Sequence, residues 1–486
     1  MKKNKYFNKK YYLVFLFISL FYLINNFYSD GGYWFDEWVT LFVSNPNVNI
    51  TEIYNRLSGH LDININGQST KLGENVPPIY YLVLRFFFSN FGFIAENGRI
   101  FSLFFFLLSI FLFYHLLNNF CHKNYSLIGA IILSLNPLLI WMANETRIDT
   151  FLIFFSILNI YLFFISYYNK KLINYVLLFS SNIFLLSIYP LTLSIIISQI
   201  IFLFFNKLMF KEKKNYLILL IIISIGFYFL TNQKYLISKS LLDTKILHTQ
   251  ISNNFFIGFY FNTYFGNLYF GGFYLLISVI LTVINYKKIL KERNIIFLII
   301  LISSTYAMII LSSKFFIPIA SPRYIIFIIP VIIYYLIYNF FLLEKTFTKY
   351  IKKDALFNVL LIFFITNIII TNDNRPIKKP PFNQALDIIQ SNNEKNIYII
   401  YDKYLSTYVP TIKKFKEYNF KILNEDFVSN DNIKSFAHLC INNPRFAVGK
   451  RNLPDDFNCS MYFEKFDIQH KVYINDFIIN FYKNKQ

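Results

Sequence analysis

Two adjacent carboxylates, Asp36 and Glu37, are the residues of this 486-residue chain whose types and place most suggest chemistry. They stand in GGYWFDEWVTLF, just past the first long apolar run and between aromatic residues. Ionised groups beside a membrane are costly to desolvate and tend to be kept for function. A carboxylate there could take a proton from a hydroxyl as a general base. The alternative is a solvated loop that happens to hold two acids, and position alone does not separate the two.

A second charged group lies in the segment NPLLIWMANETRIDTFLIFF, residues 136–155. It holds Glu145, Arg147 and Asp149 in a short turn between two apolar runs. We interpret Glu145 as a polar residue that keeps the turn hydrated. Arg147 and Asp149 begin the next apolar helix, where charge is expensive, so we expect them to be functional.

Cations stand at the starts or ends of other apolar runs. Arg323 opens one after Pro322, Lys314 precedes it in the same connection, and Arg99 begins another. An arginine at such a boundary could snorkel to the surface, or it could hold a phosphate through its forked donors.

Carboxylates and cations at membrane depth suit a reaction on a lipid-phosphate substrate. One carboxylate would take the proton of an acceptor hydroxyl, and cations would stabilise the departing phosphate. A divalent cation (Mg²⁺, Mn²⁺ or Zn²⁺) held by carboxylates could do the same work as the cations.

The composition indicates the elements that must position these residues. The chain is 55% hydrophobic and 21% aromatic with 15% charged residues, which is far too apolar for a typical soluble domain. Its apolar runs have the ~20-residue length that crosses a bilayer. The net charge of +20 is gathered in short loops between these runs, which argues against a nucleic-acid partner and for membrane lipids.

The fold class that we expect is an all-α polytopic membrane protein with about eleven transmembrane helices, by hydropathy. The basic loops are then cytoplasmic, the acidic loops lie outside, and the N-terminus is inside. The expected spans are 11–28, 98–118, 124–142, 148–168, 172–188, 191–206, 215–231, 271–286, 294–313, 322–343 and 355–371.

Two short helices are expected at the external surface. Residues 76–92 start with Pro77-Pro78 and carry Arg85 in their middle, so we place them on the membrane rather than across it. Residues 51–58 form the other helix, capped by Thr51.

The chain divides into a membrane domain, residues 1–371, and a small extracytoplasmic α/β domain, residues 372–486. In the second domain, 396–402 and 445–449 are expected to be strands and 383–391 and 405–418 helices. Cys440 and Cys459 both lie there, where an oxidising compartment would permit a disulfide; two free thiols are the alternative.

Several of these pieces, in this order, resemble the GT-C membrane glycosyltransferases, in the family 39-like branch of protein O-mannosyltransferases and lipid A aminoarabinose transferases. The pieces that carry the resemblance are Asp36-Glu37, Pro77-Pro78-Ile79-Tyr80-Tyr81, Phe91-Gly92, Glu96 with Arg99, Asn136-Pro137 through Arg147 and Asp149, and Pro322-Arg323-Tyr324. Family members often have His, Lys or Glu just before the Pro-Pro pair. Asn75-Val76 occupy those places here, with Glu74 one step further back.

The resemblance implies inverting transfer of a sugar from a polyprenyl-phosphate donor to an acceptor hydroxyl outside the plasma (inner) membrane. Asp36 would be the base, Glu37 would orient the acceptor, and Asp149 would assist. The residues that would bind the donor are Arg323, Tyr324, Lys314, Arg147, Arg99 and Tyr81. Glu37 and Glu74 would be the ligands of any metal. The acceptor could be a lipid, a glycan or a protein.

Two other functions fit parts of the pattern. A flippase or transporter of lipid-linked oligosaccharide would share the spans, but its polar groups should lie mid-span. A glycan polymerase or ligase would typically use a large external loop late in the chain, whereas the acids here come early.

Overall fold

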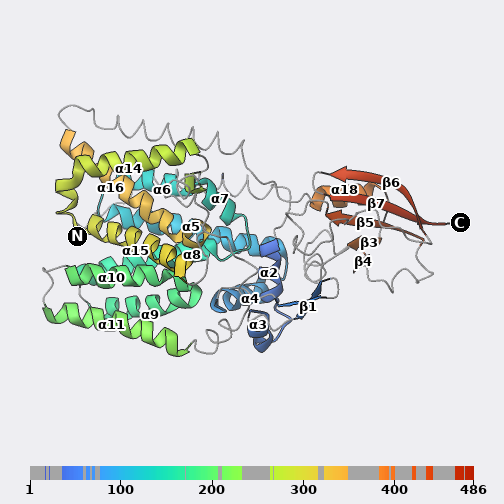
Figure 1. Cartoon of the computed structure of the whole chain (residues 1–486), viewed down its shortest axis with the longest axis horizontal. Helices are drawn as coiled ribbons and strands as arrows, with labels where there is room; N and C mark the ends of the chain where they lie inside the picture. The colour runs from blue at the N-terminus through green and yellow to red at the C-terminus, as the bar shows by residue number, and fades with distance from the viewer. Residues whose placement is uncertain are drawn as a thin grey trace.

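The computed structural model describes the chain in segments. They are residues 35–57, 62–65, 68–71, 77–169, 171–205, 211–231, 263–265, 268–315, 322–347, 382–392, 394, 396–399, 419–422, 434–441, 466–474 and 477–485, with the single positions 17 and 21. Figure 1 shows a bundle of helices with a small sheet at one end, beyond α2, α3 and α4.

The bundle contains most of the described helices. They are α5 (Ala95–Asn118), α6 (Lys123–Ser134), α7 (Pro137–Ala143), α8 (Asp149–Asn169), α9 (Leu172–Ile188), η1 (Pro190–Thr192), α10 (Leu193–Phe205), α11 (Lys211–Thr231), α14 (Leu268–Ile289), α15 (Arg293–Phe315), η3 (Pro322–Ile328) and α16 (Ile329–Phe347). Five described helices are long and apolar enough to cross a membrane, or six if the bent pair α6–α7 is one span. The chain is therefore a membrane protein.

Each expected span between residues 98 and 343 coincides with one of these helices or with a broken pair. Spans 11–28 and 355–371 lie outside the described residues, except for positions 17 and 21. The expected span at 124–142 corresponds to the pair α6 and α7, which meet at a bend of 60°. Pro137 lacks the N–H that would continue α6, and the Asn136 side chain instead caps α7 by accepting from Leu139 N at 3.1 Å.

Shorter elements lie at the end of the bundle that faces the sheet (Figure 1). They are α2 (Phe35–Val43), α3 (Ile50–Leu57), the hairpin of β1 (Asp62–Ile65) and β2 (Gln68–Lys71), and α4 (Ile79–Phe91). The helices expected at 51–58 and 76–92 are thus present. Thr51 is not a cap, because α3 begins one residue earlier at Ile50.

Helix α4 is tied to the connection after α2. Arg85 in its middle donates to the carbonyl of Pro46 at 3.0 Å, so this charged residue has a protein partner. The helix ends at Gly92, whose φ of +95° suits glycine and few other residues.

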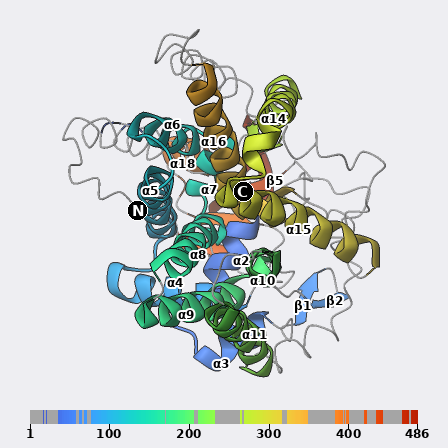
Figure 2. The same ribbon diagram turned by 90° about the vertical axis from the view of Figure 1, so that its left-hand side faces the viewer.

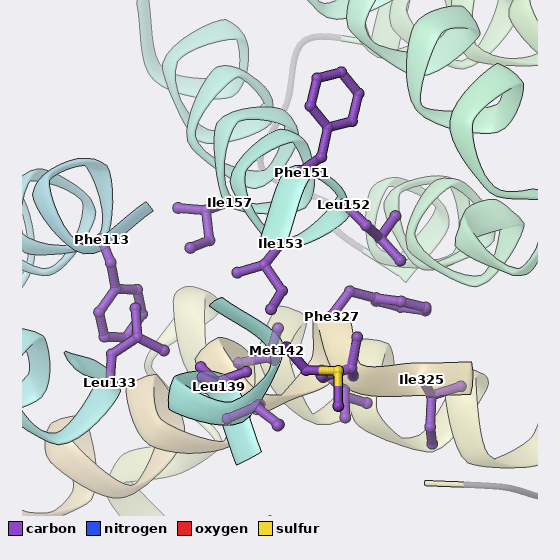
Figure 3. Packing of buried hydrophobic residues seen from close by; sticks show 14 of the residues in the cluster. Phe113, Leu133, Leu139, Met142, Phe151, Leu152, Ile153, Ile157, Ile325 and Phe327 are labelled. Carbon is purple, nitrogen blue, oxygen red and sulfur yellow. The ribbon is translucent and has the colours of Figure 1, made fainter. Parts of the chain in front are cut away.

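The bundle packs around α8. Figure 2 shows α8 near its centre, with α5 on one side and α9 and α10 on the other. Figure 3 shows how η3 joins this core: Phe327 of η3 lies with Met142 of α7 and Ile153 of α8, all three nearly or fully buried. The end of η3 is thereby held against the end of α7 and the first turns of α8.

A small polar cluster lies inside the bundle. Asn159 of α8 donates to Asn182 of α9 at 2.7 Å and accepts from Gln199 of α10 at 2.7 Å, and none of the three is exposed. Because buried amides need partners, this triad favours one arrangement of the three helices.

The sheet near the C-terminus has five strands in the order β4-β3-β5-β7-β6. Its elements are α18 (Phe382–Ser391), β3 (Asn396–Ile399), β4 (Asn419–Ile422), β5 (Ser435–Ile441), β6 (Phe466–Ile474) and β7 (Phe477–Asn484). β3 is parallel to β4 and β5, whereas β7 is antiparallel to both of its neighbours. The expected helix at 383–391 and strand from 396 are confirmed.

Other expectations for this region fall on parts that the structure leaves undescribed. They are the strand at 445–449, the helix at 405–418 and the Cys440–Cys459 link, since Cys459 and the side chain of Cys440 lie outside the described residues. The division of the chain at residue 371 stays a prediction.

A buried histidine makes the sheet sensitive to acid. His438 of β5 is fully buried beside Asn480 of β7, with 3.4 Å between its Nδ1 and the amide nitrogen. Burial lowers the pKa of His438 from 6.5 to about 3. Below pH 6.5 the unfolded chain therefore binds a proton at His438, whereas the folded sheet does not. The contribution of His438 to the free energy of unfolding is full above pH 6.5 and declines as the pH falls toward 3.

We expect the free energy of unfolding of the sheet to fall by about 3 kcal/mol between pH 7.5 and pH 4, from the shift at His438. His438→Gln can still accept from Asn480 but does not titrate, so its pH dependence should be shallower. Native-state hydrogen exchange at β5 and β7, corrected for intrinsic rates, measures this. Equal pH slopes in the two proteins would contradict the assignment.

Candidate active site

The first buried ion pair joins α2 to α5. Glu37 is fully buried, and both of its carboxylate oxygens accept from Arg99, from Nε and Nη2 at 3.2 Å each. One of the same oxygens accepts from the main-chain N–H of Thr146 at 2.8 Å. Three segments that lie far apart in sequence therefore meet at one carboxylate.

Helix α5 can approach the turn before α8 because residue 98 is glycine. A Cβ at Gly98 would lie 2.3 Å from Cγ2 of Thr146 and 2.6 Å from its Oγ1. Thr146 Oγ1 also donates to the carbonyl of Ala95 at 3.3 Å. The glycine thus permits the close contact that brings Thr146 to Glu37.

The second ion pair joins η3 to the same turn. Nη2 of Arg323 donates to Oε2 of Glu145 at 3.1 Å and to Oδ2 of Asp149 at 3.4 Å. The side chains of Glu145 and Asp149 are 1% and 6% exposed, whereas that of Arg323 is 28% exposed. The two buried carboxylates hold the guanidinium, and the Arg323 side chain as a whole stays partly exposed.

Tyr189 lies close to this second pair. Because Pro190 follows, Tyr189 takes an extended conformation and ends α9. Burial raises the pKa of Tyr189 well above its usual range, and Tyr324 and Asp149 raise it further, while Arg147 and Arg323 oppose them. Groups from two other segments, 147–149 and 323–324, therefore act on Tyr189 at this end of the bundle.

Comparisons with known proteins agree with this architecture. The family model for dolichyl-phosphate-mannose-protein mannosyltransferases matches residues 75–230, which include Arg99, Glu145 and Asp149. The structure of ArnT from Cupriavidus metallidurans bound to undecaprenyl phosphate superimposes with a TM-score of 0.53 at 10% identity, covering 98% of each chain. Its apo structure gives 0.50 at 10% identity, covering 97% of this chain and 98% of ArnT. The chain has the GT-C fold.

The oligosaccharyltransferase of Archaeoglobus fulgidus with a tethered acceptor peptide is less similar, with a TM-score of 0.49 at 10% identity over 89% of this chain and 69% of that one. No curated protein matches the chain by sequence.

The GT-C fold brings part of the expected site together. Glu37 and Arg99 pair with each other, and Asp149 meets Arg323, with Arg147 and Tyr324 nearby. Tyr81 is buried in α4, edge-on to Tyr80 with 5.3 Å between the ring centroids. Asp36 lies in α2 and Lys314 in α15, but the side chains of both, and all of Glu74, are outside what the structure describes.

One expectation from the sequence is wrong, and two residues were missed. Glu145 does not keep its turn hydrated, because it is buried and paired with Arg323. Thr146 joins the site through its main-chain N–H and Tyr189 through packing. Neither kind of contact produces a charge pattern that the sequence could reveal. Glu145 lies four residues before Asp149, and that spacing could have indicated a shared partner.

The described residues do not fit a metal ion. Both oxygens of Glu37 already accept hydrogen bonds from Arg99, and the buried oxygens of Glu145 and Asp149 that face Arg323 are engaged by it. No group of three or more His, Cys, Asp or Glu side chains among the described residues could hold an ion. The reaction proposed below therefore assigns no role to a metal ion.

Gly98→Ala should separate α5 from the turn at Thr146 and weaken both contacts of Glu37. We expect it to lower the free energy of unfolding by about 1–3 kcal/mol through overpacking. Thermal unfolding of the purified protein in detergent measures the change. Gly226→Ala in α11 is the matched control, because a Cβ there meets nothing within 4 Å. Thr146→Ala in the Gly98→Ala background should restore part of the loss, and equal stability of the two glycine variants would contradict the close approach.

Proposed function

We propose that this protein transfers a sugar from a polyprenyl-phosphate donor to an acceptor hydroxyl on the extracytoplasmic face of the plasma membrane, with inversion at the sugar carbon. The observation that carries the proposal is Arg323, a partly exposed arginine whose guanidinium is held by two buried carboxylates at one end of a GT-C bundle. The side of the membrane follows from the basic loops, which occupy the opposite ends of the helices.

Arg323 is suited to a phosphate for a physical reason. A guanidinium presents several N–H donors in one plane, which match the oxygens of a phosphate. Glu145 and Asp149 both accept from Nη2, and we propose that the phosphate binds the other donors of the guanidinium. Arg147 and Tyr324 lie nearby, and we assign them to the same subsite. That the ArnT structure holds undecaprenyl phosphate supports this class of donor.

The reaction that we propose has one displacement. The acceptor oxygen attacks the anomeric carbon from the face opposite the phosphate, and the bond between that carbon and the phosphate oxygen breaks. Asp36 takes the hydroxyl proton, and the polyprenyl phosphate leaves with the bonding electron pair. Arg323 stabilises the charge that develops on the phosphate.

Glu37 and Arg99 have a supporting part in this proposal. Their mutual pairing, with Thr146 N as a third partner, engages both groups inside the protein. We infer that they position α2, and with it Asp36, relative to the turn that carries Glu145 and Asp149.

Replacing Asp36 by Asn removes the base but keeps a side chain of similar size. We expect Asp36→Asn to lower kcat by about 10²- to 10⁴-fold, the usual contribution of a general base. The measurement is transfer of radiolabelled sugar from synthetic polyprenyl-phosphate donors to the glycolipids and proteins of a membrane extract. Asp387→Asn on the exposed face of α18 is the matched control and should leave transfer unchanged. Normal transfer by the Asp36 variant would remove the base assignment.

Replacing Arg323 by Lys keeps the charge but loses the planar fork. We expect the dissociation constant for undecaprenyl phosphate to rise about tenfold, since hydrogen bonds to charged groups contribute ~1.5–3 kcal/mol. Arg56→Lys in α3 changes another paired arginine, which contacts Glu52 and Phe42 instead, and should leave the affinity unchanged. Equal affinities of the two variants would place the phosphate elsewhere.

A further inference from the structure

Tyr264 belongs to a described segment of three residues, 263–265. Its side chain is fully buried. Its main-chain carbonyl accepts from Nδ2 of Asn136 at 2.7 Å, and its hydroxyl donates to the carbonyl of Pro322 at 3.2 Å. Tyr264 therefore connects the start of α7 to the start of η3.

These contacts complete a closed chain of bonded residues that includes Arg323, the proposed phosphate ligand. Asn136 caps α7, and the turn after α7 carries Glu145. Glu145 binds Arg323, and Arg323 follows Pro322 in the chain. From Asn136 the main chain of α7 leads to Glu145, and an ion pair joins Glu145 to Arg323. Pro322 precedes Arg323 in the chain, and Tyr264 connects Pro322 back to Asn136.

The hydroxyl of Tyr264 acts on the peptide group that leads into Arg323. The proline ring fixes φ of Pro322, so the main freedom left to this peptide is ψ of the same residue. A hydrogen bond to the Pro322 carbonyl restricts that rotation and hence the direction in which Arg323 leaves the chain. Pro322 is buried, so water does not replace Tyr264 at its carbonyl.

We propose that Tyr264 is a positioning residue for Arg323 and thereby sets the affinity for the phosphate of the lipid donor. The proposal rests on the proposed function, since it names Arg323 as the phosphate ligand. Tyr264 is not a catalytic residue, because it acts through the main chain of Pro322 and Arg323. A role in packing alone would predict equal effects from any buried tyrosine hydroxyl of the bundle.

Tyr264→Phe tests this, because it removes the hydroxyl and leaves the ring. Tyr338→Phe is the matched control: Tyr338 of α16 is also buried, and its hydroxyl donates to Oε2 of Glu292 at 3.0 Å, in the connection between α14 and α15. Undecaprenyl phosphate is the probe, and its dissociation constant is measured on the full-length protein in detergent. Hydrogen exchange at the amides of η3 and thermal unfolding are measured on the same samples.

We expect Tyr264→Phe to raise the dissociation constant about fivefold, as the loss of one neutral hydrogen bond would, and to speed exchange at η3. Tyr338→Phe should change neither readout while lowering thermal stability to a similar degree. Equal dissociation constants for the two variants, or unchanged exchange at η3, would overturn the positioning role.

The two proposals can fail separately. If the unmodified protein does not bind undecaprenyl phosphate, the donor assignment in the proposed function is wrong. Hydrogen exchange at the amides of η3 then tests by itself whether Tyr264 restrains the segment that carries Arg323. Faster exchange in Tyr264→Phe than in Tyr338→Phe supports this restraint, and equal exchange in the two variants rejects it.

Discussion

Buried carboxylates and arginines hold the turn between α7 and α8 from two sides. The arrangement of the whole site depends on the position of this turn. Glu37 binds the main chain of Thr146 from the side of α2 and α5, and Arg323 binds Glu145 and Asp149 from the side of η3. Because the turn spans only a few residues, a shift of one ion pair moves the groups of the other. Segments that are distant in sequence are thus fixed relative to one another by three carboxylate–arginine contacts and by the hydrogen bond from Thr146 N to Glu37.

Such contacts specify geometry more than they stabilise the fold. Removing charges from water is costly, and a buried ion pair often offsets little more than its own desolvation. Breaking one is nevertheless severe, because the remaining partner is left buried without compensation. That asymmetry explains why the glycine at position 98, which lets α5 approach Thr146, matters: Thr146 is the main-chain partner of the buried Glu37.

The helices could be predicted closely where apolar length alone decides. The spans expected at 148–168 and 294–313 appear as Asp149–Asn169 and Arg293–Phe315. Hydropathy did not indicate the bend between α6 and α7, because it averages over a window and does not register one proline with a capping asparagine before it. The sheet was predicted only in its first helix and strand, since pairing between distant strands is not a local property of the chain.

The sequence by itself determined that this is a membrane protein with carboxylates and arginines at the ends of its apolar helices, because hydropathy and charge are properties of short segments. It also indicated the GT-C fold through the order of several short motifs. Only the tertiary structure decided which charges are partners. Glu145 resembles a surface residue in the sequence and is a buried ligand of Arg323, and Arg99 resembles a phosphate ligand and is engaged by Glu37. The reason is physical: burial and pairing depend on which helix ends meet in space, and close packing across the chain fixes this.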